Sequence, residues 1–166
     1  FNNIHMGLAG EYVAEKFSIG REPQDEYAAN SHKKAVAAIE GGKFKEEIIP
    51  ITIPQRKKDD IIFDTDESPR AGTTAEGLAK LRPAFKKDGV VTAGNAPPVN
   101  DGAAAVVVTS EEKASELGIT PMARIVGYAV SGVDPKELLI APVTAVQKLL
   151  AKVGWSKEEV DLYELN

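Results

Sequence analysis

The last third of the chain alternates extended and helical patterns, and this constrains the fold more than any other feature. Residues 123–131 and 160–165 are rich in apolar side chains at strand length. Between them, Pro142 and Gly154 delimit a helical pattern, with proline in the first turn and glycine just past the end. A strand, a helix and a strand at this spacing predict a right-handed parallel crossover, and therefore an α/β fold class.

The region before this pattern is predicted to be loop-rich and of α+β type. Helical patterns are expected over residues 9–17, 21–39, 73–81 and 110–118. Strands are expected over residues 48–53, 61–63, 90–93 and 103–109. Thr73 and Glu76 have the spacing of a capping box, whereas Gly41 and Gly42 are a strong stop signal for the long helix.

Composition excludes several classes of function. The 166 residues contain no cysteine and two histidines, which excludes disulfides and a cysteine nucleophile and disfavours a metal site. The net charge of −5 predicts no nucleic-acid partner, and no apolar run approaches the roughly 20 residues of a membrane span. We therefore expect a cytoplasmic protein with no membrane partner. Both ends lie inside patterns, which predicts an internal piece of a longer protein.

Few segments carry chemistry by pattern alone. His5, at a loop-to-helix entry, is a candidate catalytic residue or a cap, whereas His32 is predicted to be a solvated residue on a lysine-rich helix. Residues 93–102 form a tight loop of small residues, where a ligand could approach the backbone. A basic cluster forms either a solvated face or a site for a phosphorylated ligand, and it comprises Lys80, Arg82, Lys86 and Lys87.

Several motifs, in order along the chain, carry a resemblance to a known family. They are "HMGLAGEYVA" from His5, "REPQDEYA" from Arg21, "FKEEIIP" from Phe44, "KLRPAFKKDGVVTAGNA" from Lys80, "GVDP" from Gly132 and the final "DLYELN". The first resembles the pattern H-M-G-x-T-A-E-N-V-A of thiolases, and the last resembles the approach to their N-E-A-F motif. The chain is similar to thiolases over essentially its whole length.

The resemblance implies a partial thiolase-like fold. Residues 1–90 would belong to the loop domain of the N-terminal half, residues 91–120 to the end of that half, and residues 121–166 to the start of the C-terminal half. The loop-rich α+β insertion would thus be followed by strands and helices of a layered α-β-α-β-α core.

The resemblance also implies acyl transfer between coenzyme A (CoA) thioesters. A cysteine thiolate would take part in thiolytic cleavage or Claisen condensation of a short-chain 3-ketoacyl-CoA such as acetoacetyl-CoA. In the family both reactive cysteines and the catalytic histidine lie outside this stretch, so the 166 residues alone are expected to be inactive. CoA thioesters would be substrates, no further cofactor is expected, and the full-length protein is expected to be a dimer or tetramer.

Site residues are carried over from matching positions. Asn166 resembles the asparagine that holds an oxyanion-hole water. His5 and Met6 resemble residues lining the acyl-pantetheine pocket. Residues of the CoA cleft are implied at Arg70, Leu81, Phe85 and Ala93.

Two departures from the family pattern affect this site. Pro97-Pro98 replaces the Ser-Gly of G-N-A-S-G, and proline cannot donate the hydrogen bond that the serine makes to pantetheine. Residues 138–142, "LLIAP", replace M-G-x-G-P, so that Leu138 stands for methionine in the acyl pocket and two glycines are lost.

Three other interpretations are open at this point. A degradative 3-ketoacyl-CoA thiolase would differ in the width of its acyl pocket. A non-catalytic thiolase-like protein that binds CoA or a lipid would be compatible with the double proline. A structural α/β domain is what composition alone would predict.

Overall fold

The computed structural model of the protein describes residues 3–165 and divides into two compact units. We call Ala14–Pro97 the central unit, and Phe1–Val13 with Pro98–Asn166 the flanking unit. The elements in chain order are α1 (Met6–Lys16), α2 (Arg21–Glu40), β1 (Ile51–Ile53), β2 (Ile61–Phe63), α3 (Ala75–Leu78), α4 (Glu111–Glu116), the 3-10 helix η1 (Pro135–Ile140), α5 (Ala141–Val153) and the 3-10 helix η2 (Lys157–Glu159). Among the described residues, none of the helices is both long and apolar enough to cross a membrane.

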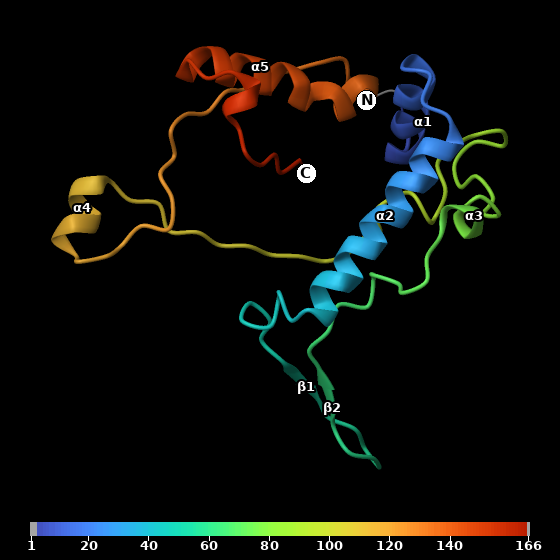
Figure 1. The fold of residues 1–166 in the computed structure, drawn as a ribbon, viewed down its shortest axis with the longest axis horizontal. Coiled ribbons are helices and arrows are strands. Elements are labelled where there is room, and N and C mark those ends of the chain that lie inside the picture. The colour runs from blue at the N-terminus through green and yellow to red at the C-terminus, as the bar shows by residue number, and fades with distance from the viewer. Residues whose placement is uncertain (1–2, 166) are drawn as a thin grey trace. The chain divides into compact units, whose positions relative to one another are not determined.

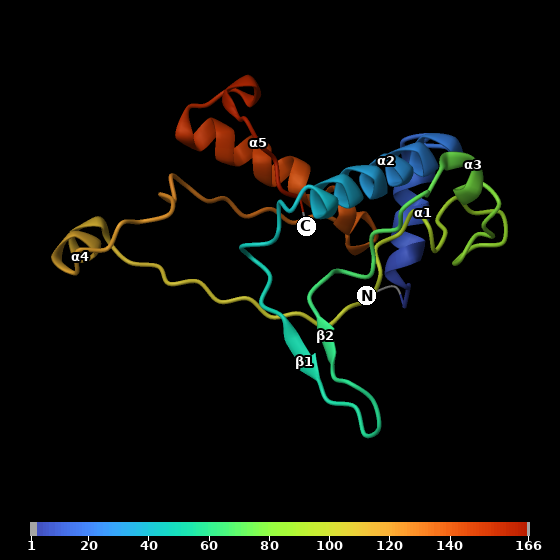
Figure 2. The same ribbon diagram turned by 60° about the horizontal axis from the view of Figure 1, so that its bottom comes forward.

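The central unit is organised around α2, whose first turn lies beside α3 (Figure 1). The Arg21 guanidinium at the start of α2 donates to the Leu78 carbonyl at the end of α3. Beyond the other end of α2, β1 and β2 form an antiparallel hairpin in which Thr52 pairs with Ile62. The hairpin extends well away from α2 (Figure 2) and both of its faces are exposed. Its position therefore owes little to burial.

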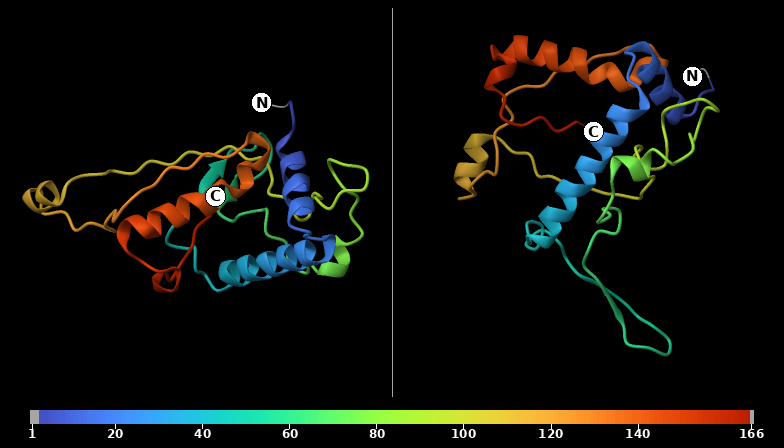
Figure 3. Two further views of the ribbon diagram at one scale, coloured as in Figure 1. Left: turned by 90° about the horizontal axis from the view of Figure 1, so that it is seen from above. Right: turned by 45° about the vertical axis from the view of Figure 1, so that its right-hand side comes forward.

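The flanking unit consists of helices joined by long extended segments. Helix α4 lies at the far end of two such segments (Figure 3). Helix α5 packs on the second segment, where a Cβ at Gly127 would lie 2.7 Å from Val153 Cγ1 and 3.2 Å from Leu149 Cδ1. Glycine at position 127 permits this close approach, because a Cβ there would force the Val153 and Leu149 side chains to move.

Most predicted helices are confirmed, with shifted ends. Helix α2 ends at Glu40 as expected, and α5 begins and ends next to Pro142 and Gly154, where Gly154 adopts φ +72°. The predicted Thr73 cap is wrong by one residue. The Thr74 hydroxyl instead accepts from the Gly77 N–H (3.1 Å), and α3 stops at Leu78 rather than Leu81.

Four predicted strands are not formed. Residues 90–93, 103–109, 123–131 and 160–165 contain no strand in the structure, although Thr92 makes one antiparallel bridge to Pro83. A strand exists only with a hydrogen-bonded neighbour, and apolar composition does not supply one. The predicted parallel crossover around α5 is therefore absent from the described residues, while its helix is present.

The Ser110 cap of α4 is expected to be necessary for this six-residue helix. Its hydroxyl accepts from the Lys113 N–H (3.1 Å), and Ser110→Ala should destabilise α4 by about 1 kcal/mol. Hydrogen exchange should then be roughly fivefold faster at the Ala114 and Leu117 amides, which bond within this helix. Ser115→Ala, inside the same helix, is the control and should not accelerate exchange.

Candidate functional site

A half-buried side-chain amide, that of Asn95, organises the loop that carries the predicted cleft residues Ala93 and Pro97. The Thr92 N–H donates to Asn95 Oδ1 (2.7 Å), and Asn95 Nδ2 donates to the Val90 carbonyl (2.9 Å). Thr92 is fully buried, and its hydroxyl accepts from the Gly94 N–H (3.2 Å). Hydrogen bonds of side chains, rather than pairing in a sheet, therefore hold the shape of this loop.

The same amide ties this loop to α2. Asn95 Nδ2 also donates to Asp25 Oδ1 (3.0 Å), and Asp25 Oδ2 accepts from Arg21 Nε (2.6 Å). Asp25 is 1% exposed, and Arg21 continues the chain of contacts to the Leu78 carbonyl. A buried carboxylate is costly unless it is paired, so this network holds α2, α3 and residues 90–96 in one arrangement.

Gly94 lies against two leucines of the same unit. A Cβ at this position would meet Leu81 Cδ1 at 2.5 Å and Leu78 Cδ2 at 2.6 Å. The glycine therefore permits a close approach between the loop and the end of α3. The sequence indicated a loop in which a ligand could approach the backbone, and in the structure Gly94 packs closely against leucine side chains.

In the central unit, three predicted cleft residues lie on two stretches of chain that run side by side. The Ala84 N–H donates to the Val91 carbonyl (2.9 Å), and Pro83 bridges Thr92, so residues 81–85 run back along residues 91–93. Leu81 is 39% exposed, Phe85 is half-buried and Ala93 is exposed, which leaves them available to a ligand.

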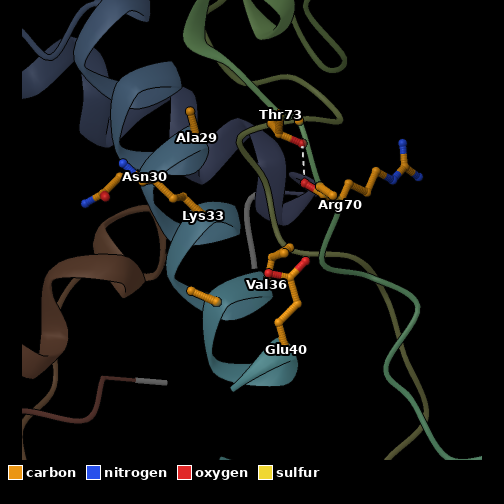
Figure 4. Close-up of a pocket in the computed structure, with 10 residues that line it drawn as sticks. Ala29, Asn30, Lys33, Val36, Glu40, Arg70 and Thr73 are labelled. Atoms are coloured by element: carbon orange, nitrogen blue, oxygen red, sulfur yellow. Dashed lines mark hydrogen bonds between the residues drawn. The ribbon is translucent and has the colours of Figure 1, made fainter. Parts of the chain in front are cut away.

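Arg70 borders a groove that sequence reasoning did not predict (Figure 4). The hollow has a volume of about 550 Å³, and it is lined by Ala29, Asn30, Lys33, Val36, Ala37, Glu40 and residues 70–73. The Arg70 side chain extends away from α2, while its carbonyl accepts from the Thr73 hydroxyl (2.9 Å). The groove residues of α2 recur every three or four positions in the sequence, which could have indicated that they share one face of the helix. Small and charged side chains at such positions are also typical of a solvent-exposed face.

His32 does not have the solvated role predicted for it. Its Nδ1 accepts from the Arg70 N–H (3.2 Å), and the residue is half-buried. The bond joins residues 38 positions apart, so helical periodicity could not have indicated it. His32 thereby positions the backbone of the segment that carries Arg70.

In the flanking unit, His5 caps the first turn of α1. Its Nδ1 accepts from the Gly7 N–H (3.1 Å) and its carbonyl accepts from the Leu8 N–H (2.8 Å). Helix α1 therefore begins at Met6, three residues before the predicted start. Met6 is 50% exposed, and Leu138, on η1, is 49% exposed.

Two predicted positions remain, Pro97 and Asn166. Pro97 is exposed and is the last residue of the central unit. The predicted catalytic Asn166 lies outside the described residues. The predicted residues thus divide between the units, three described ones in the flanking unit (His5, Met6, Leu138) and five in the central unit (Arg70, Leu81, Phe85, Ala93, Pro97).

One carboxylate of α3 has a shifted pKa. A hydrogen bond from its own backbone N–H, with a second from the Thr74 hydroxyl, lowers the pKa of Glu76 at the first turn of α3. Within the described residues, no cluster of three histidines or acidic side chains could hold a metal ion.

Comparison with known proteins decides the family. The model of the thiolase N-terminal domain matches residues 1–112, and that of the thiolase C-terminal domain matches residues 119–166. The chain belongs to the thiolase family. The predicted boundaries at residues 90/91 and 120/121 remain predictions.

Two bacterial relatives of this thiolase chain are named acetyl-CoA acetyltransferases. The chain is 58% identical over all 166 residues to an acetyl-CoA acetyltransferase of Pseudomonas aeruginosa and 55% identical to one of Thiocystis violacea. It spans 42% of the length of each of these relatives.

The fold agrees with this membership. The crystal structure of the Bacillus anthracis acetyl-CoA acetyltransferase aligns with a TM-score of 0.87 and 55% identity, covering 96% of this chain and 40% of that one. Human mitochondrial 3-ketoacyl-CoA thiolase aligns with a TM-score of 0.86 and 45% identity, covering 95% of this chain and 40% of that one. The predicted thiolase-like α/β fold class is therefore confirmed.

Proposed function

We propose that this thiolase chain works in acyl transfer between CoA thioesters, as part of an acetyl-CoA acetyltransferase. The observation that carries the proposal is its 58% identity, over all 166 residues, to a relative of that name. The reaction is thiolytic cleavage of acetoacetyl-CoA or the reverse Claisen condensation. The chain has no cysteine, so the thiolate would come from outside these 166 residues.

The proposed roles follow the two units. Arg70, Leu81, Phe85, Ala93 and Pro97 would contact CoA, while His5, Met6 and Leu138 would line the acyl-pantetheine pocket. The network of Asn95 and Asp25 supports the assignment of Ala93, because it anchors residues 90–96 on α2, and preorganised groups lose less entropy on binding a substrate. Asn166 would hold a water molecule that stabilises the oxyanion. CoA thioesters would be the only small molecules required, and a cytoplasmic dimer or tetramer is proposed for the whole protein.

Mass and turnover of the protein purified from its own cells test the proposal. We expect an intact mass of about 42 kDa, the 17.7 kDa of this chain divided by the 42% that it spans of its relatives. We also expect CoA-dependent cleavage of acetoacetyl-CoA that is abolished by alkylation of cysteine with iodoacetamide.

Three outcomes would contradict it. A protein of 17.7 kDa that cleaves no acetoacetyl-CoA would contradict the enzyme. Binding of CoA or a lipid without turnover would favour the non-catalytic thiolase-like alternative. Pro97 is compatible with that alternative, because proline cannot donate a hydrogen bond to pantetheine. A protein that prefers longer 3-ketoacyl-CoA thioesters would be a degradative thiolase.

A further inference from the structure

One tyrosine of α1 contacts two consecutive residues of η1 in the flanking unit. The Tyr12 hydroxyl donates to Glu137 Oε1 (3.1 Å) across 125 residues of sequence. Lys136 Nζ lies 5.3 Å from the centroid of the same ring, within the range of a cation–π interaction. Both Lys136 and Glu137 are half-buried, as is Tyr12, so these contacts are sheltered from solvent.

The segment that Tyr12 contacts has little burial of its own. Its 3-10 helix begins at Asp134, whose Oδ1 accepts from the Lys136 N–H (3.1 Å), and 3-10 hydrogen bonds have poorer geometry than those of an α-helix. Leu138 and Leu139 are about half exposed, and no residue of η1 is fully buried. The position of η1 therefore rests on its direct continuation into α5 and on side-chain contacts such as those of Tyr12.

One departure from the family pattern lies in this contact, and a second lies in the residues that follow it. Tyr12 stands where the thiolase pattern H-M-G-x-T-A-E-N-V-A has asparagine, and Leu139 and Ala141 stand where M-G-x-G-P has glycines. The backbone here has φ −101° at Ile140 and φ −54° at Ala141, values that do not require glycine. An asparagine at position 12 is too short to place a ring under Lys136 and a hydroxyl at Glu137.

We propose that Tyr12 is a positioning residue that fixes η1 and, through it, the acyl group that the enzyme accepts. The inference rests on the proposed function, in which Leu138 lines the acyl pocket. Fixed by Tyr12, the leucine side chain narrows the pocket toward an acetyl-sized group. Loosening the contact lets η1 yield to a longer acyl chain.

The test compares two substrates in the full-length enzyme. In Tyr12→Phe the ring stays under Lys136 and only the bond to Glu137 is lost. We expect the ratio of kcat/KM for 3-ketohexanoyl-CoA to that for acetoacetyl-CoA to rise about three- to tenfold, the range of one hydrogen bond. Glu137→Ala should give the same rise, whereas Glu137→Gln, which keeps an acceptor oxygen, should restore the wild-type ratio. Tyr27→Phe is the control, because Tyr27 is 80% exposed on α2.

Hydrogen exchange over residues 135–140 supplies a second measurement. Faster exchange in Tyr12→Phe together with the change in substrate ratio supports the inference. Faster exchange with an unchanged ratio reduces Tyr12 to a structural contact and overturns it, as does unchanged exchange. A wild-type enzyme that turns over neither substrate refutes the proposed function and this inference together, whereas an active enzyme with an unchanged ratio refutes this inference alone.

Discussion

Replacing Asp25 with alanine is expected to lower the free energy of unfolding by about 3 kcal/mol. The substitution removes the carboxylate between Arg21 Nε and Asn95 Nδ2 and leaves both donors without this acceptor. Breaking a buried pair costs roughly 3–5 kcal/mol, and the lower end applies because the Arg21 side chain is 22% exposed. Urea unfolding of the purified protein, followed by circular dichroism, measures the loss.

The control for this variant is Glu26→Ala, on the same helix and exposed. It should change stability by less than about 0.5 kcal/mol, as is usual for surface positions. Amides of residues 90–96 should also exchange faster in Asp25→Ala, because Asn95 loses its anchor on α2. Equal effects of the two substitutions would show that the Asp25 network does not hold the loop.

Valine at position 94 is expected to cost about 1–3 kcal/mol through overpacking. Its Cβ would lie within 2.6 Å of methyl groups of both Leu81 and Leu78, and Leu78 is only 8% exposed. Both contacts are at the ends of flexible side chains, so part of the clash can relax, and the protein should still fold. The same urea titration measures this cost.

A double substitution separates overpacking from other causes. Leu81→Ala combined with Gly94→Val removes one of the two clashing methyl groups, so the two effects should be less than additive. Gly102→Val is the control, since a Cβ there meets no atom within 4 Å. Additive effects, or an equal loss in Gly102→Val, would contradict the packing role of Gly94.

Local features of the fold were predictable because neighbours in sequence determine them. The end of α2 at Gly41 and the Ser110 cap of α4 follow from side chains or backbone within one turn. The hairpin strand at residues 61–63 was also predicted with its observed bounds. The His5 cap was one of two interpretations of the sequence, and the structure shows that bond.

The sequence predicted which residues belong to the candidate site, but not the contacts that arrange them. The motif from Lys80 to Ala96 marked the segment, but the bonds that shape it join Asn95 to Asp25 and Arg70 to His32, across 70 and 38 residues. No periodicity or spacing rule encodes such pairs. The ligand roles of the predicted residues are still predictions.

The sequence by itself determined the family, most of the helices and the local cap at Ser110, because motifs and capping side chains act over a few residues. Only the tertiary structure decided that residues 123–131 form no strand, since a strand needs a partner whose presence the segment cannot specify. It also decided that Gly94 serves packing and that Tyr12 meets Glu137. These contacts form only when folding brings distant segments together. The sequence around each residue therefore contains no sign of the stabilisation that they provide.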